Sequence, residues 1–140
     1  MKRLAPNPNQ QCVGCRQCEL ACSIVHEGCF APWLARVKVD RKEDIVLSSP
    51  VICRHCSDAP CAAACPVDAI IKSEATGAYY VDNRLCIGCL QCIEACPYRA
   101  VFFNNSKGIA LKCDMCAGDP ACVRACPNGV IVEEEVGGRV

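Results

Sequence analysis

The chain has 140 residues, the length of one small domain, and 17 of them are cysteine. Its 15 basic residues balance its 15 acidic ones, so electrostatics give no support to a nucleic-acid or acidic-lipid partner. The large share of cysteine is typical of a chain whose fold depends on disulfides or on metal ligands.

The first ten residues, MKRLAPNPNQ, contain two prolines and lack the apolar stretch of a secretory signal. No apolar run in the sequence is long enough to cross a bilayer, so we expect a cytoplasmic protein without direct membrane insertion. An odd number of cysteines at repeating spacings also argues against a disulfide framework.

Sixteen of the cysteines fall into four runs of four, numbered run one to run four in chain order. Run one, CVGCRQCELAC, and run three, CIGCLQCIEACP, have gaps of two, two and three residues. Run two, CRHCSDAPCAAACP, and run four, CDMCAGDPACVRACP, have wider middle gaps of four and five residues. The cysteines are Cys12, Cys15, Cys18 and Cys22; Cys53, Cys56, Cys61 and Cys65; Cys86, Cys89, Cys92 and Cys96; and Cys113, Cys116, Cys122 and Cys126.

Every run ends in C-x3-C, and three of the four continue with proline, at Pro66, Pro97 and Pro127. C-x2-C-x2-C-x3-C-P is the ligand pattern of bacterial 4Fe–4S clusters, in which the fourth cysteine binds a neighbouring cluster. A zinc site could use a thiolate pair such as CDMC, but zinc requires neither the fixed later spacing nor the proline. The pattern therefore predicts iron–sulfur clusters, and a zinc-stabilised interaction module is the distant alternative.

Short helices and hairpins are predicted within and between the runs. The C-x3-C spacing predicts one helical turn, because residues four apart share a helix face, and the proline then ends that turn. Apolar alternation around turn residues predicts three antiparallel hairpins and a last strand. Their ranges are 35–41 with 44–49, 69–82, 100–112 and 129–135. The expected fold class is α+β and ferredoxin-like.

Five residues outside the ligand pattern raise separate questions. Cys29 remains after sixteen ligands are assigned; we expect a buried, inert thiol that is not a ligand, with a reactive thiol as the alternative. His26 and His55 are expected to pack or to hydrogen-bond a cluster sulfur, because each run already has four thiolates. Lys112 either stabilises cluster charge or is solvated. Trp33 is predicted to pack in the core.

Across almost its whole length the sequence resembles the four-cluster, ferredoxin-type electron-transfer subunits of molybdenum and tungsten oxidoreductases. The four runs in order, with the phrases CRHCSDAPC and KCDMC, carry this likeness. Systems of this kind include formate dehydrogenase, dimethyl sulfoxide reductase, aldehyde oxidoreductase, and some hydrogenases and carbon monoxide dehydrogenases. Ser23, where a two-cluster ferredoxin has proline, is a departure common in these subunits.

The resemblance implies four 4Fe–4S clusters in a single polyferredoxin domain. The outer runs would form an outer module of residues 1–45 plus 107–140, and the middle runs a central module of residues 46–106. Each module would hold two clusters about a pseudo-two-fold axis. The implied ligand groups are Cys12, Cys15, Cys18 and Cys126; Cys22, Cys113, Cys116 and Cys122; Cys53, Cys56, Cys61 and Cys96; and Cys65, Cys86, Cys89 and Cys92.

The implied function is electron transfer without catalysis. The sequence has no dinucleotide or phosphate-binding motif, and so many ligand thiolates leave little chain for a substrate pocket. We expect a subunit, with no catalytic residues, that relays single electrons. Its partners would be a large catalytic subunit of the Mo/W-pterin type and a flavoprotein, a ferredoxin or another copy of itself. A free soluble polyferredoxin shuttle is the alternative.

Overall fold

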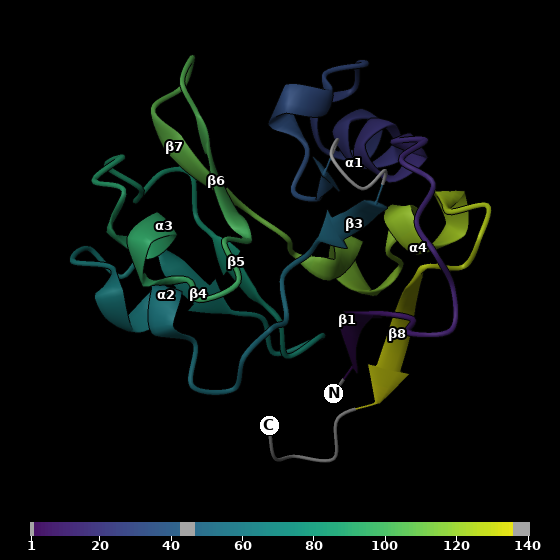
Figure 1. The fold of residues 1–140 in the computed structure, drawn as a ribbon. Helices are drawn as coiled ribbons and strands as arrows, with labels where there is room; N and C mark the ends of the chain where they lie inside the picture. Colours follow the sequence, from purple (N-terminus) through teal and green to yellow (C-terminus); the bar gives the residue numbers. More distant parts are fainter. Residues whose placement is uncertain (1, 43–46, 136–140) are drawn as a thin grey trace.

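The fold, in a computed structural model that describes residues 2–42 and 47–135, is a mixture of short helices and short strands (Figure 1). The elements η1 and η3 are 3-10 helices. In chain order the elements are β1 (Lys2–Pro6), α1 (Gln17–Glu27), η1 (Pro32–Leu34), β2 (Lys38–Lys42), β3 (Leu47–Val51), α2 (Pro60–Ala64), β4 (Ile70–Lys72), β5 (Tyr79–Val81), α3 (Gln91–Ala95), β6 (Val101–Asn104), β7 (Ile109–Lys112), η3 (Met115–Gly118), α4 (Ala121–Ala125) and β8 (Ile131–Glu135).

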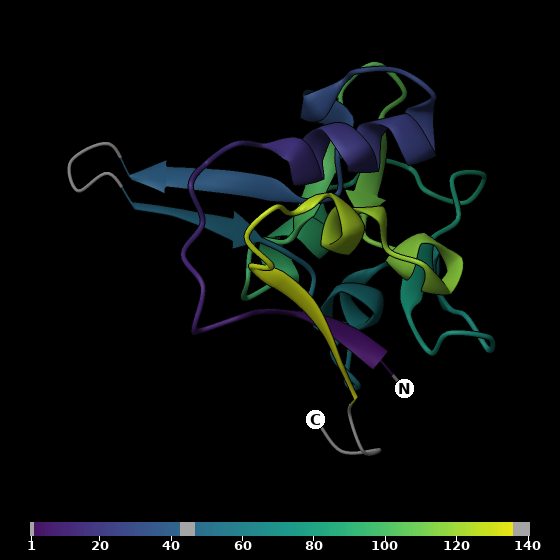
Figure 2. The same ribbon diagram turned by 90° about the vertical axis from the view of Figure 1, so that its right-hand side faces the viewer.

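The strands form four two-stranded antiparallel sheets: β1–β8, β2–β3, β4–β5 and β6–β7. The last three are the predicted hairpins, and the prediction of short antiparallel hairpins is confirmed. Residues 44–46 of one predicted strand lie outside the described residues. The β2–β3 hairpin extends away from the helices in Figure 2.

The pairing of β1 with β8 was not predicted. It joins segments far apart in the sequence, with Lys2 opposite Glu135 and Pro6 opposite Ile131. The guanidinium of Arg3 donates a hydrogen bond to Glu134 at 2.6 Å across this sheet. The small sheet therefore ties run one to run four.

Proline sets the length of three of the four α-helices. α2, α3 and α4 end at the fourth cysteine of their runs, where proline follows and cannot continue the backbone ladder. Run one has Ser23 instead, and α1 continues to Glu27 before Gly28 ends it in a left-handed conformation. Ser23 is fully buried, and its hydroxyl bonds the carbonyl of Leu20 and the amide of Ala31.

Two clusters of buried residues form the core, and ligand-pattern cysteines belong to both. The first cluster includes Leu4, Val37, Val39, Ile52, Met115 and Ile131 with Cys18, Cys22 and Cys122. The second includes Ile70, Val101 and Ala110 with Cys61 and Cys92. In Figure 1, α2, α3 and β4–β7 gather on one side of the molecule, and α1, α4, β1 and β8 on the other. Trp33 belongs to neither cluster and is 68% exposed, so its predicted core role is wrong.

Candidate metal centre

The residue before the second cysteine of every run has a left-handed backbone. In runs one and three it is Gly14 (φ 73°) and Gly88 (φ 72°), and in runs two and four it is His55 (φ 48°) and Met115 (φ 60°). This conformation curls the chain sharply, so the first two cysteines of a run can face one point. Glycine is the ordinary residue there, and only two of the four runs show this signal in the sequence.

A second repeated turn follows the cysteine–proline pairs. Asp68, Arg99 and Gly129, each three residues after a fourth cysteine, have positive φ. The next amide then turns back and donates to the sulfur of that cysteine, at 3.2 Å for Cys65, 3.4 Å for Cys96 and 3.3 Å for Cys126. Cys22, which proline does not follow, instead accepts from the amide of Arg36 at 3.1 Å. Such amide donors favour a thiolate, the form that binds iron.

Three cavities are each lined by four cysteines that come from two different runs. They are similar in size, about 340, 350 and 370 Å³ including space open to solvent, and their other lining residues are mostly apolar. We name the cysteines around them the first set (Cys12, Cys15, Cys18 and Cys126), the second set (Cys53, Cys56, Cys61 and Cys96) and the third set (Cys65, Cys86, Cys89 and Cys92).

The four remaining cysteines of the pattern, here the fourth set, are Cys22, Cys113, Cys116 and Cys122. Cys22 and Cys122 are buried in the first core cluster, and Cys113 packs against it. Burial, followed by the charges of Cys22 and Cys116, raises the pKa of Cys122 to about 12. The thiols of this set are therefore close enough to influence one another.

The buried thiols need a cation in order to ionise. Burial raises the pKa of Cys18 to about 12 and is also the largest cause of the raised pKa of Cys92, about 11. Thiols so strongly shifted stay protonated in the empty protein, whereas a bound metal deprotonates its thiol ligands outright. Four thiols around one cavity, with amides donating to sulfur, are the donor set of an iron–sulfur cluster. The residues therefore fit the predicted group.

Lys112 is a buried cation among these sulfurs, and only 5% of its surface is exposed. Its ammonium donates to the sulfur of Cys53 at 3.1 Å and to the carbonyl of Tyr79 at 2.9 Å, and lies 3.5 Å from the carbonyl of Cys113. Burial opposes its charge, but the anionic sulfurs of Cys53, Cys61 and Cys113 raise the pKa of Lys112 overall. Of the two possibilities left open by the sequence, the structure shows the buried cation.

His55 is buried within run two and is 1% exposed. Neither of its ring nitrogens has a hydrogen-bond partner among the described residues. Burial and the nearby charge of Lys112 lower the pKa of His55 to about 3. An imidazole so deeply buried normally has a partner, and cluster sulfur at the adjacent cysteines would be a suitable acceptor.

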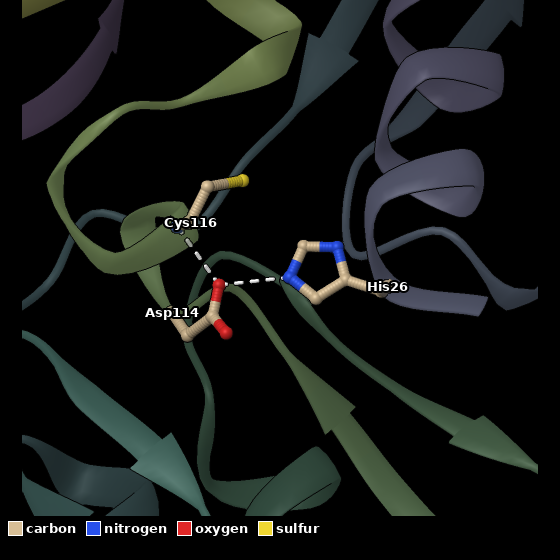
Figure 3. Close-up of side chains that lie close together, drawn as sticks. All are labelled: His26, Asp114 and Cys116. Atoms are coloured by element: carbon tan, nitrogen blue, oxygen red, sulfur yellow. Dashed lines mark hydrogen bonds and ion pairs between the residues drawn. The ribbon is translucent and has the colours of Figure 1, made fainter. Parts of the chain in front are cut away.

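His26 and Asp114 form a hydrogen-bonded pair beside the fourth set (Figure 3). The ring of His26, from α1, bonds a carboxylate oxygen of Asp114 at 2.9 Å, and the same oxygen accepts from the amide of Cys116 at 2.9 Å. The other ring nitrogen lies 3.6 Å from the sulfur of Cys22. The bond to Asp114, followed by that to Cys22, raises the pKa of His26 to about 10. Although His26, Asp114 and Cys116 are close enough to share a metal ion, two of the three hold the fourth set in position.

Two expectations about the surroundings of the sets are settled. Cys29 is exposed, so the prediction that it is buried is wrong; it follows the glycine that ends α1, and the space there is open. Arg124 is an exposed residue paired with Asp119 at 3.0 Å, not a buried counter-charge.

The hairpins, the short helices that end at cysteine–proline pairs, and the cysteine-lined cavities together define a ferredoxin-type iron–sulfur protein. Comparison with known proteins agrees with this class. The chain belongs to the 4Fe-4S dicluster domain family, whose profile matches residues 45–136. It is an electron-transfer iron–sulfur protein of the kind found as a subunit of oxidoreductases.

Two relatives show the range of this similarity. The chain is 40% identical over 116 residues to the aliphatic sulfonate oxidoreductase, polyferredoxin-like subunit, of Pyrococcus furiosus, covering 83% of this chain and 66% of that protein. It is 33% identical over 155 residues to the electron transport protein HydN of Escherichia coli K12, covering 94% and 87%. The chain thus spans just under two thirds of the first relative and most of the second.

A solved structure has the same fold over nearly the whole chain. The active site complex BamBC of benzoyl coenzyme A reductase matches with a TM-score of 0.55 and 27% identity, covering 98% of this chain and 81% of that one. Within residues 2–42 and 47–135, no helix has the length and apolar character that a bilayer span requires.

Proposed function

We propose that the chain binds four 4Fe–4S clusters and relays single electrons between a large catalytic redox subunit and a second redox protein, without catalysing a reaction itself. The observation that carries the proposal is that cysteines from different runs meet around three similar cavities, while the four others lie together beside His26 and Asp114. When bound, each cluster would accept and release one electron.

Each of the four sets would hold one cluster. In every set, three cysteines come from the start of one run and the fourth comes from the end of another. The lining of the three cavities supports this division for the first, second and third sets. The neighbouring charges at Cys122 support it for the fourth set.

The sets are linked by neighbouring thiols in the order third, second, fourth, first. After burial, the charge of Cys61 in the second set helps to raise the pKa of Cys92 in the third set. Burial and then Cys53 raise the pKa of Cys113, which links the second set to the fourth. Burial and several thiols, Cys18 of the first set among them, raise the pKa of Cys122 in the fourth. Because tunnelling rates fall steeply with distance, a row of neighbouring sites is suited to transport.

The two ends of this row reach the surface. Among the sixteen cysteines of the sets, only Cys15 of the first set and Cys89 of the third are exposed. Exposed apolar residues flank both, with Val13 beside Cys15 and Ile87 and Leu90 beside Cys89. Apolar surface around an exposed ligand suits contact with a redox partner. Electrons would therefore enter at one of these ends and leave at the other.

The row also suits a division into two modules, with residues 1–45 plus 107–140 as the outer and 46–106 as the central module. Residues 1, 43–46 and 136–140 lie outside the described residues. The packing of α1 against α4 and of α2 against α3 supports a pseudo-two-fold arrangement. The β6–β7 hairpin crosses the boundary, and Lys112 at its end contacts both cysteine groups.

The proposed catalytic partner is a subunit of the Mo/W-pterin type, and the second partner is a flavoprotein, a ferredoxin or another copy of this chain. The resemblance in the four runs supports the first choice. Two relatives, one named as part of a tetrathionate reductase and the other as the thiosulfate reductase electron transfer protein PhsB, support a catalytic partner in general. A reducing compartment such as the cytoplasm suits the many ligand thiolates.

Anaerobic purification from the native host tests the proposal. We expect a brown protein with about sixteen iron and sixteen acid-labile sulfide per chain, visible absorption that dithionite bleaches, and a complex with a large redox protein in native mass spectrometry. Only half as much iron would disprove four clusters, and colourless protein with stoichiometric zinc would favour the zinc module. A loaded monomer that turns over as a soluble carrier would favour the free shuttle.

A further inference from the structure

Lys112 occupies the junction between the second and fourth sets. Its ammonium lies 3.1 Å from the sulfur of Cys53 and 3.5 Å from the carbonyl of Cys113. A third contact, 2.9 Å to the carbonyl of Tyr79, uses the remaining donor. With its three N–H groups directed at acceptors and 5% of its surface exposed, the side chain has a defined position in the protein.

A buried lysine is rare, because removing its charge from water is costly unless an opposite charge compensates. Here the compensating groups are sulfurs of two cysteine sets. An opposite charge held at short range in the interior is screened far less than one at the surface. Each electron that arrives at the second set adds negative charge next to this cation.

His55 provides an independent observation at the same junction. It lies between Cys53 and Cys56 in run two, is 1% exposed, and has no partner for either ring nitrogen among the described residues. An imidazole always carries at least one N–H, whatever its protonation state. A buried donor of this kind is costly unless an acceptor completes it, and sulfur of the second set is the adjacent acceptor.

We infer that Lys112 and His55 form a polar junction that makes the second set the easier of the two inner sites to reduce. This inference rests on the proposed function. Reduction adds one electron, supplied by a redox partner or by dithionite in the experiment, and no bond forms or breaks. The formal charge of the four-cysteine group changes from about −2 to about −3. The ammonium and the N–H donor stabilise the added charge, so an electron in the row rests preferentially at the second set.

The test is a redox titration of the anaerobically purified full chain, followed by electron paramagnetic resonance, with iron and sulfide measured on every sample. Lys112→Met removes the charge and keeps the apolar stem, whereas Lys112→Arg keeps the charge. Lys2→Met is the matched control, because Lys2 is exposed at the edge strand β1 and its change removes the same charge. A Cys56→Ser variant identifies the signal of the second set.

At the potential where the wild-type second set is half reduced, Lys112→Met should lower its ratio of reduced to oxidised form by at least about tenfold. Lys112→Arg should restore most of this ratio, and Lys2→Met should leave it unchanged. His55→Leu should shift the ratio in the same direction by a smaller factor. His55→Asn should recover part of it, because asparagine donates a hydrogen bond and tolerates the left-handed φ of 48°.

Unmoved potentials in fully loaded Lys112→Met protein would overturn the inference, as would an equal shift in Lys2→Met. If Lys112→Met lost iron, Lys112→Gln, which keeps N–H donors without the charge, would be judged by the same criterion. A lysine that only supported the fold would change iron content and leave the potential of the loaded set unmoved. Wild-type protein without a cluster in the second set would overturn the proposed function as well, which separates the two failures.

Discussion

Gly88 lies so close to Gly108 that a Cβ added to it would be 2.5 Å from the carbonyl oxygen of Gly108. Gly88 is the left-handed residue before the second cysteine of run three, and Gly108 is in the turn of the β6–β7 hairpin. Because the opposing atom belongs to the backbone, it cannot move aside as a flexible side chain would. The contact fixes the loop of run three on the hairpin.

Gly88→Ala should therefore displace this loop and remove the cluster of the third set, about four of sixteen iron atoms. Gly28→Ala is a matched control, because Gly28 has the same φ of 72° and nothing within 4 Å of an added Cβ. The control should lose only the roughly 1–2 kcal/mol of left-handed strain and should keep its iron. Iron analysis and thermal unfolding would compare the two, and equal iron loss would contradict the role of the contact.

Two exposed cysteines, Cys15 and Cys29, allow a direct test of ligand assignment. Cys15 belongs to the first set, whereas Cys29 follows α1 and lines none of the three cavities. Cys15→Ser should lower the iron content by up to about one quarter or alter one paramagnetic signal. Cys29→Ser should leave iron and all signals unchanged; iron loss there would show that Cys29 is a ligand.

Much of the fold could be predicted because the cysteine runs and the hairpins are local patterns. The three hairpins follow from apolar alternation, and the ends of α2, α3 and α4 follow from the proline after each run. The length of α1 was not predicted, although Ser23 in place of proline was the signal for it. The β1–β8 pairing had no local signal, because its register depends on the approach of distant segments.

The surroundings of the cysteines were less predictable than the cysteines themselves. Arg99 and His55 have positive φ although neither is glycine, since the tertiary structure overrides their backbone preference. The bond between His26 and Asp114 joins residues 88 positions apart, and no spacing rule could anticipate it. Lys112 resembled any other cation near a run until its burial was known.

The exchange of fourth cysteines predicts a specific pattern of damage. Cys126 lines the cavity of the first set, with Cys12, Cys15 and Cys18. Cys126→Ala should therefore perturb the paramagnetic signal of the first set and leave the second and third sets intact. Loss of a second-set or third-set signal instead would contradict the pairing of the outer runs.

Asp114 should stabilise the fourth set through its two hydrogen bonds, to the ring of His26 and from the amide of Cys116. Asp114→Ala should cost about 2 kcal/mol of the free energy of unfolding, because both partners are at least partly buried, and should release the cluster of the fourth set first. Asp119→Ala is the control, since its ion pair with Arg124 is exposed and is worth less than about 1 kcal/mol. Equal losses of iron in the two variants would contradict the bracing role of Asp114.

The pairing of β1 with β8 has a consequence for the order of assembly on the ribosome. The second and third sets are complete once Cys96 has been synthesised, whereas Cys12, Cys15 and Cys18 must wait for Cys126. We expect the first thiols to be made to be among the last to be enclosed, so that they stay accessible to zinc and oxidants throughout translation. Thiol labelling of arrested nascent chains would show this as strong modification of run one until run four has emerged.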